Sequence, residues 1–208
     1  MPPRLGPDVP APLFGAPDRG RGLLVGVVIA LLATITRFWA LTHPTDKGTP
    51  VFDEKHYVPQ GWQVLSGGNW IEDNPAYGLV VHPPVGKWML AASEAVFGYG
   101  PLGWRVAPAI SGVLIVVLIY CAVRRLTRST LVGAIAGVFA ICDGVLFVQS
   151  RMGMLDIFQA VFVVAAFAAP ITASLSTLPG SASVTLYSAA GRIASSCSLI
   201  SSQGVCRR

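Results

Sequence analysis

Four apolar stretches divide the chain. They run over residues 22–41, 106–123, 131–148 and 157–171. Twenty residues of α-helix rise about 30 Å, which is the thickness of the hydrocarbon core of a bilayer. The first stretch is near this length and exceeds the 7–15 apolar residues of a cleavable signal peptide. The pattern therefore predicts four membrane-spanning helices. Near the end of the first, Arg37 is expected to extend its side chain to the membrane interface.

A long segment, residues 42–104, separates the first two apolar stretches. Long loops between membrane helices usually carry function. Residues 54–65 form an amphipathic pattern that Pro59 would bend. Residues 85–97 form a second short apolar pattern, with Trp88 as an interfacial anchor. The sequence predicts two short helices at the membrane surface within this loop.

Composition supports a membrane protein. Hydrophobic residues make up 53% of the chain and charged residues 12%, about half the charged fraction of a soluble domain. These values exclude a disordered chain, a disulfide scaffold and an ordinary cytosolic domain. The four cysteines lie in apolar stretches and in the C-terminal segment, with neither a disulfide framework nor metal-ligand spacing.

The net charge of +5 depends on where the arginines lie. They gather before the first apolar stretch and between the second and third: Arg4, Arg19, Arg21, Arg124, Arg125 and Arg128. The positive-inside rule places both groups in the cytoplasm. Residues 1–21 are then a cytoplasmic tail, and the loop 42–104 faces outward. The positive charge indicates topology and not a nucleic-acid surface.

Two groups in the outward loop could carry chemistry. Asp53 and Glu54 could act as a general base and an orienting group at the membrane rim, or they could be the acidic first turn of a solvated helix. Spacing alone favours the helix start. His82 and Lys87 flank a Pro-Pro turn that could hold both toward one site. Alternatively, the turn only begins a helix.

Charges at the membrane boundary form another group of candidates. Arg105 and Arg151, with Asp156 nearby in sequence, are expected on the outer face, where cations could bind a lipid phosphate or simply anchor the helices. Asp143 lies inside the third apolar stretch. An acid within a span is a functional candidate by default. The alternative is a pair with an arginine that holds the helices together.

Taken together, these motifs resemble a known family. Phe52-Asp53-Glu54, His82-Pro-Pro-x-Gly-Lys87, Arg105, and Asp143 followed by Gln-Ser-Arg151-x-x-x-Leu-Asp156 occur in this order in protein O-mannosyltransferases, especially the actinobacterial type that uses polyprenyl-phosphate-mannose. The resemblance covers residues 22–169. It implies an all-α polytopic membrane bundle of GT-C type. It also implies transfer of mannose, on the outer face of the cell membrane, to Ser or Thr hydroxyls of proteins emerging from the secretion channel.

The resemblance also implies roles for the residues. Asp53 would be the base and Glu54 would shape the acceptor site. Arg105 and Arg151 would stabilise the charge that develops on the leaving phosphate. His82 and Asp156 would orient their neighbours, and Lys87 and Asp143 would belong to the substrate-binding set. A single attack would invert the anomeric carbon. No cofactor is expected beyond the lipid-linked donor, and the need for a metal stays open.

The pattern changes at about Pro170. Residues 170–208 contain no Asp or Glu, and ten of the 39 are serine, against five serines in all the residues before them. We expect a partial transmembrane domain over 22–169, followed by an atypical serine-rich segment from a frameshift or truncation, or by a genuine tail. We expect the 208-residue chain to be inactive alone. The alternatives are a GT-C transferase for arabinose or aminoarabinose, and a four-span membrane protein without enzymatic activity.

Overall fold

The computed structural model describes residues 19–43, 49–71 and 82–173. Within these ranges the chain forms seven helices and no strand: α1 (Arg19–Phe38), α2 (Glu54–Gly67), α3 (Pro84–Phe97), α4 (Pro101–Thr127), α5 (Thr130–Cys142), α6 (Gly144–Gln149) and α7 (Asp156–Ala173). Of the expected serine-rich segment 170–208, the structure describes only residues 170–173, which continue α7, and most of the expected N-terminal tail also lies outside the described residues.

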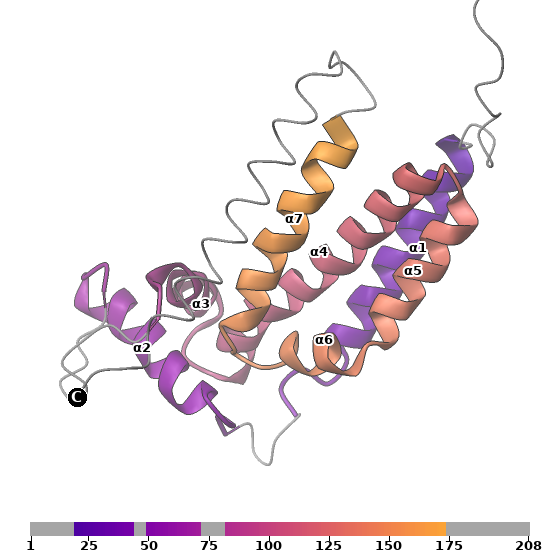
Figure 1. The fold of residues 1–208 in the computed structure, drawn as a ribbon. Coiled ribbons are helices and arrows are strands. Elements are labelled where there is room, and N and C mark those ends of the chain that lie inside the picture. The colour runs from indigo at the N-terminus through magenta and orange to yellow at the C-terminus, as the bar shows by residue number, and fades with distance from the viewer. Residues whose placement is uncertain (1–18, 44–48, 72–81, 174–208) are drawn as a thin grey trace, which may run out of the picture.

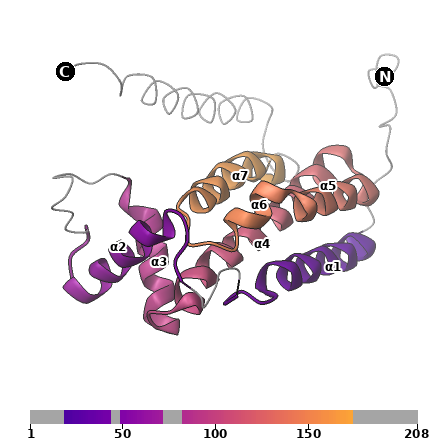
Figure 2. The ribbon, with the colours of Figure 1, turned by 90° about the horizontal axis from the view of Figure 1, so that it is seen from below.

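The long helix α4 is the centre of the bundle. It packs against α1, α3, α5 and α7, and α1 also packs against α5. Helices α2 and α3 form a pair at one end of the long helices (Figure 1; Figure 2 shows the same pair from below). One core cluster joins α2, α3, α4 and α7 around Val58, Leu90 and Phe158. A second joins α1, α4 and α5 around Ile29 and Tyr120. The α2–α3 pair is therefore packed onto the bundle by a shared core.

Two of the four predicted spans meet the length of a bilayer. Helices α1 and α4 have 20 and 27 residues and mean hydropathies of 1.8 and 2.5 over their most apolar windows. Helices α5 and α7 are apolar but shorter. The predicted positions agree with these four helices to within a few residues, apart from the third.

The third predicted span, residues 131–148, is broken at Asp143, so the interpretation of Asp143 as an acid within one continuous helix is wrong. Helix α5 ends at Cys142, and Asp143 takes an extended conformation with φ −64° and ψ 119°. Its carboxylate accepts a hydrogen bond of 2.6 Å from the backbone N–H of Leu146 and so caps α6. Aspartate favours this position because its side chain replaces the missing helical acceptor.

The two short helices predicted in the long loop are present as α2 and α3. Pro59 lies inside α2 without ending it, and α2 stops where Gly68 takes a left-handed φ of 66°. Pro84 begins α3, as suits the first helical position. The pair approach closely at Gly61, where a Cβ would lie 3.2 Å from both the Glu94 carboxylate and Leu90. A side chain at this position would push its neighbours apart by a few tenths of an ångström, so glycine suits this approach.

Arg37 does not extend to the membrane interface as expected. Its side chain is fully buried and donates a hydrogen bond of 3.1 Å to the carbonyl of Ala140, in the last turn of α5. The last carbonyls of a helix have no intrahelical partner. Arg37 supplies one because α1 packs directly against α5.

Candidate active site

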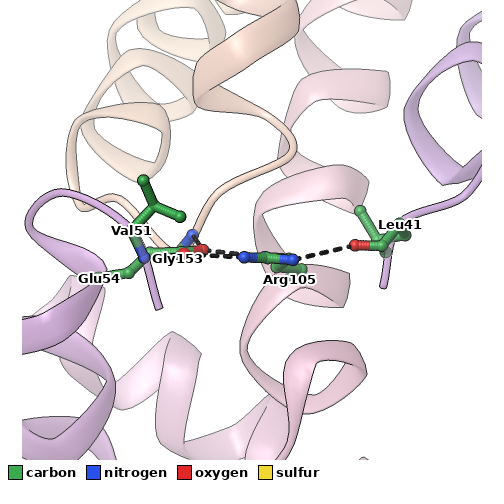
Figure 3. A network of polar contacts seen from close by, with 5 residues as sticks. All are labelled: Leu41, Val51, Glu54, Arg105 and Gly153. Carbon is green, nitrogen blue, oxygen red and sulfur yellow. Dashed lines mark hydrogen bonds and ion pairs between the residues drawn. The ribbon is translucent and has the colours of Figure 1, made fainter. Parts of the chain in front are cut away.

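A buried ion pair joins the beginning of α2 to the beginning of α4. Arg105 donates from Nε to Glu54 Oε1 at 3.0 Å and from Nη2 to Glu54 Oε2 at 2.9 Å, and neither side chain is exposed to solvent (Figure 3). This two-point geometry matches the planar guanidinium to the planar carboxylate. The sequence assigned the two residues to separate tasks, and the structure brings them together.

The Glu54 carboxylate also receives two backbone hydrogen bonds. The N–H of Gly153 lies 2.6 Å from Oε1 and that of Val51 lies 2.9 Å from Oε2. Arg105 in turn donates to the carbonyl of Leu41 at 3.4 Å. One buried pair thus ties together the loop after α1, the beginnings of α2 and α4, and the turn between α6 and α7 (Figure 3). A buried charge pair is tolerated when its remaining hydrogen-bonding capacity is used in this way.

Asp53, the residue before Glu54, has a different environment. It precedes α2 as the N-cap residue and is half-buried. Its backbone carbonyl accepts from the N–H of Tyr57 at 3.0 Å, so Tyr57 lies one turn further along the same side. The Tyr57 hydroxyl is hydrogen-bonded to Nε2 of His82 at 3.1 Å, and the two rings meet edge to face at 5.4 Å.

Tyr57 is the residue that the sequence analysis missed. Burial raises its pKa, and its interactions with the Asp53 and Asp156 carboxylates raise it further. Of the predicted site residues, His82 therefore contacts the tyrosine hydroxyl, and Asp53 and Asp156 act on it through their charges. The spacing of four residues between Asp53 and Tyr57 is the signal that could have found it.

Arg151 lies in the turn between α6 and α7, near Arg105. Its Nη2 donates to the carbonyl of Trp39 at 2.6 Å and to that of Ala40 at 3.3 Å. Its guanidinium carbon lies 5.1 Å from the centre of the Phe147 ring. Burial lowers the pKa of Arg151, and the positive charge of Arg105 lowers it further. Two cations are thus held close together, one paired with Glu54 and one bound to backbone carbonyls.

Lys87 and Asp143 differ in burial. Lys87 is fully buried in the first turn of α3, whereas His82, five residues earlier, is exposed. Asp143 is exposed, caps α6 and interacts electrostatically with Arg37. This geometry favours the alternative in which Asp143 helps to hold the helices together. In the described part of the chain, no group of three or more His, Cys, Asp or Glu side chains could hold a metal ion.

The fold and the site define a helical membrane protein with a cluster of titratable side chains near the beginnings of α2 and α4. The model of the dolichyl-phosphate-mannose-protein mannosyltransferase family matches residues 81–191, more than half of the chain, and the chain belongs to this family. The matched range continues past Pro170, where the sequence changes character. The predicted class, an all-α membrane bundle of GT-C type, is confirmed.

Curated relatives give a more specific similarity. The chain is 60% identical over 166 residues to a polyprenol-phosphate-mannose–protein mannosyltransferase of Mycobacterium tuberculosis H37Rv, covering 80% of this chain and 32% of the relative. The corresponding protein of Mycolicibacterium smegmatis is 58% identical over 163 residues, covering 78% and 31%. The chain therefore spans about a third of the length of these relatives.

A more distant similarity connects the chain to a second transferase. An undecaprenyl phosphate-alpha-4-amino-4-deoxy-L-arabinose arabinosyl transferase of Pseudomonas aeruginosa is 31% identical over 114 residues, covering 54% of this chain and 21% of the relative. No solved structure matches the chain significantly.

Proposed function

We propose that this chain provides the acceptor side of an enzyme that transfers mannose from polyprenyl-phosphate-mannose to Ser or Thr hydroxyls of secreted proteins. The names of the mycobacterial relatives support this donor and a protein as the acceptor. Asp53 is the proposed base. The observation that carries the proposal is the contrast between two adjacent carboxylates, because Glu54 is buried in a bidentate ion pair while Asp53 stays half-exposed beside Tyr57 and His82.

The reaction requires a base and a means of stabilising the departing phosphate. The acceptor hydroxyl oxygen attacks C1 of mannose, the bond from C1 to the phosphate oxygen breaks, and polyprenyl phosphate leaves as a monoester. Asp53 takes the hydroxyl proton, which a positioned carboxylate does effectively. Attack opposite the leaving phosphate inverts the configuration at C1. Fixed cations near the departing oxygen stabilise its negative charge.

Among the cations, Arg151 is the proposed contact for the leaving phosphate, with Lys87 in support. Arg105 acts by holding Glu54, and through it the beginning of α2, in place. His82 and Asp156 orient the groups around Asp53. In this proposal the N-terminus is cytoplasmic, and the loop 42–104 faces the outer side of the cell membrane, where the acceptor emerges from the secretion channel.

The coverage of the relatives motivates a further part of the proposal. Because the chain spans about a third of their length, we propose that the 208-residue chain is inactive alone and needs the remaining part of such an enzyme to complete donor binding. A chimera, in which residues 22–169 of this chain replace the matching part of the M. smegmatis protein, would restore the missing segments.

The experiment measures transfer of radiolabelled mannose from polyprenyl-phosphate-mannose to a Ser/Thr-Pro-rich peptide. The chimera should transfer mannose, its Asp53→Asn variant should lose transfer by about 100-fold or more, and both should insert equally into membranes. His56→Gln changes an exposed residue on the same helix and should leave the rate unchanged. Unchanged transfer by Asp53→Asn would remove Asp53 from the role of base. Transfer by the 208-residue chain alone would refute the need for completion.

A second acceptor separates mannosyl transfer from the activity named for the Pseudomonas relative. The same chimera is offered lipid A with the aminoarabinose donor. Transfer of aminoarabinose to lipid A, without mannosylation of the peptide, would overturn the proposed substrates while leaving Asp53 as a candidate base.

A further inference from the structure

Tyr57 connects a half-buried carboxylate to an exposed imidazole. The charge of the Asp53 carboxylate acts on its hydroxyl, which lies 3.1 Å from Nε2 of His82, within hydrogen-bond distance. The backbone fixes the first contact, since the N–H of Tyr57 bonds the Asp53 carbonyl at 3.0 Å. The edge-to-face packing of the two rings fixes the second. Both interactions involve the Tyr57 hydroxyl, which therefore connects the Asp53 carboxylate to the His82 ring.

Exposure increases along this chain of contacts. Asp53 and Tyr57 are half-buried, and His82 is exposed. A base that takes a proton in each turnover must release it before the next, and a hydrogen-bonded path to water serves this need. Histidine is suited to the outer end, because it exchanges protons with water near neutral pH. Asp156, exposed at the start of α7, adds a negative charge that acts on Tyr57.

We propose that Tyr57 relays to His82 the proton that Asp53 takes from the acceptor hydroxyl. The inference rests on the proposed function, because that reaction supplies the proton. It assigns a role to a residue for which the sequence analysis had none. Tyr57 acts through Asp53 and does not touch the reacting atoms, so it is a positioning and relay residue.

The step balances without any other reactant. Protonated Asp53 donates its hydrogen to Tyr57 Oη while the hydrogen of Tyr57 passes to Nε2 of His82. Asp53 returns to the carboxylate, Tyr57 remains a neutral phenol with a new hydrogen, and His82 becomes an imidazolium. His82 then gives a proton to water. The phenol never ionises, which agrees with the raised pKa of Tyr57.

The test compares Tyr57→Phe with its parent in the mannose-transfer assay of the chimera. Phenylalanine keeps the ring and removes the hydroxyl, so the kcat should fall by about 10-fold or more while the KM changes by less than about twofold. Added imidazole should restore much of the lost rate, because a small base can accept the proton directly from Asp53. Tyr99→Phe is the matched control. Tyr99 packs against Trp62 and Trp104, and removing its hydroxyl should change neither value.

A second variant distinguishes loss of the relay from loss of the folded structure. His82→Ala removes the exposed end of the relay without altering the core, and imidazole should restore its rate as well. Circular dichroism should give the parent helix content for both variants. The inference is overturned if Tyr57→Phe transfers mannose at the parent rate, or if both slow variants stay slow in imidazole, as a merely structural role would require. Absence of transfer by the parent chimera is a different result. It would refute the proposed function and remove the source of the proton.

Discussion

Glu94 gives the fold a pH dependence that can be measured without any substrate. It lies on α3 with 1% of its surface exposed, and neither carboxylate oxygen has a hydrogen-bond partner in the part of the chain that the structure describes. Desolvation by burial raises its pKa from 4.5 to about 8. The folded protein therefore holds Glu94 as a neutral acid at pH 7, whereas the unfolded chain releases the proton.

The sign and the size of the effect follow from this difference. Between pH 4.5 and about 8 the folded state binds one more proton than the unfolded state, so the free energy of unfolding falls as the pH rises. The slope approaches about 1.4 kcal/mol per pH unit, and the loss across the interval is at most about 5 kcal/mol. The contribution is complete below pH 4.5, and none of it remains above the folded pKa.

The variant Glu94→Gln keeps the shape of the neutral acid and cannot ionise. Chemical unfolding in detergent micelles, followed by helix circular dichroism at pH 5 and pH 8, measures the free energy of unfolding of both proteins. The parent should lose several kcal/mol between the two pH values, and Glu94→Gln should lose much less, becoming the more stable protein at pH 8. Asp156→Asn, at an exposed carboxylate, should follow the parent. Parallel pH profiles for the parent and Glu94→Gln would refute the reasoning.

Three further predictions concern contacts within the fold. Glu54→Gln should cost about 3–5 kcal/mol in unfolding free energy, because it leaves the buried charge of Arg105 without its partner. Combining it with Arg105→Gln should cost less than the sum of the two single changes, and additive costs would contradict the pairing. Asp143→Ala should lower the free energy of unfolding by about 1 kcal/mol through loss of the α6 cap, and Asp143→Asn should restore most of it in a thermal melt. Arg37→Met should cost about 1–3 kcal/mol because it leaves the carbonyl of Ala140 unpaired, and an unchanged unfolding midpoint would argue against that contact.

Local sequence patterns predicted the helices well wherever a helix depends on its own residues. The helical pattern over 54–65 and the Pro-Pro turn before residue 85 appear as α2 and α3. The prediction of a single third span was wrong for an equally local reason. Hydropathy averages over Asp143 and Gly144, but one aspartate that bonds the N–H of Leu146 is enough to end one helix and begin another.

The site contacts could not be predicted in the same way. Glu54 and Arg105 are 51 residues apart in the chain, and Tyr57 and His82 are 25 apart. Such pairs form only when the α2–α3 pair packs on α4, and no periodicity in the sequence encodes that packing. The order of the motifs supplied candidate residues without showing which of them bind one another.

The adjacent pair Asp53 and Glu54 shows how one dipeptide can serve two purposes. Successive residues at the start of a helix point about 100° apart, so two neighbouring carboxylates cannot face the same partner. Glu54 turns inward, where Arg105 and two backbone N–H groups bind both of its carboxylate oxygens. Asp53 is then half-exposed on another face, and the buried ion pair of Glu54 beside it fixes its position. Under the proposed function Asp53 must accept a proton in a fixed geometry, and the neighbouring glutamate, anchored by Arg105, provides that rigidity.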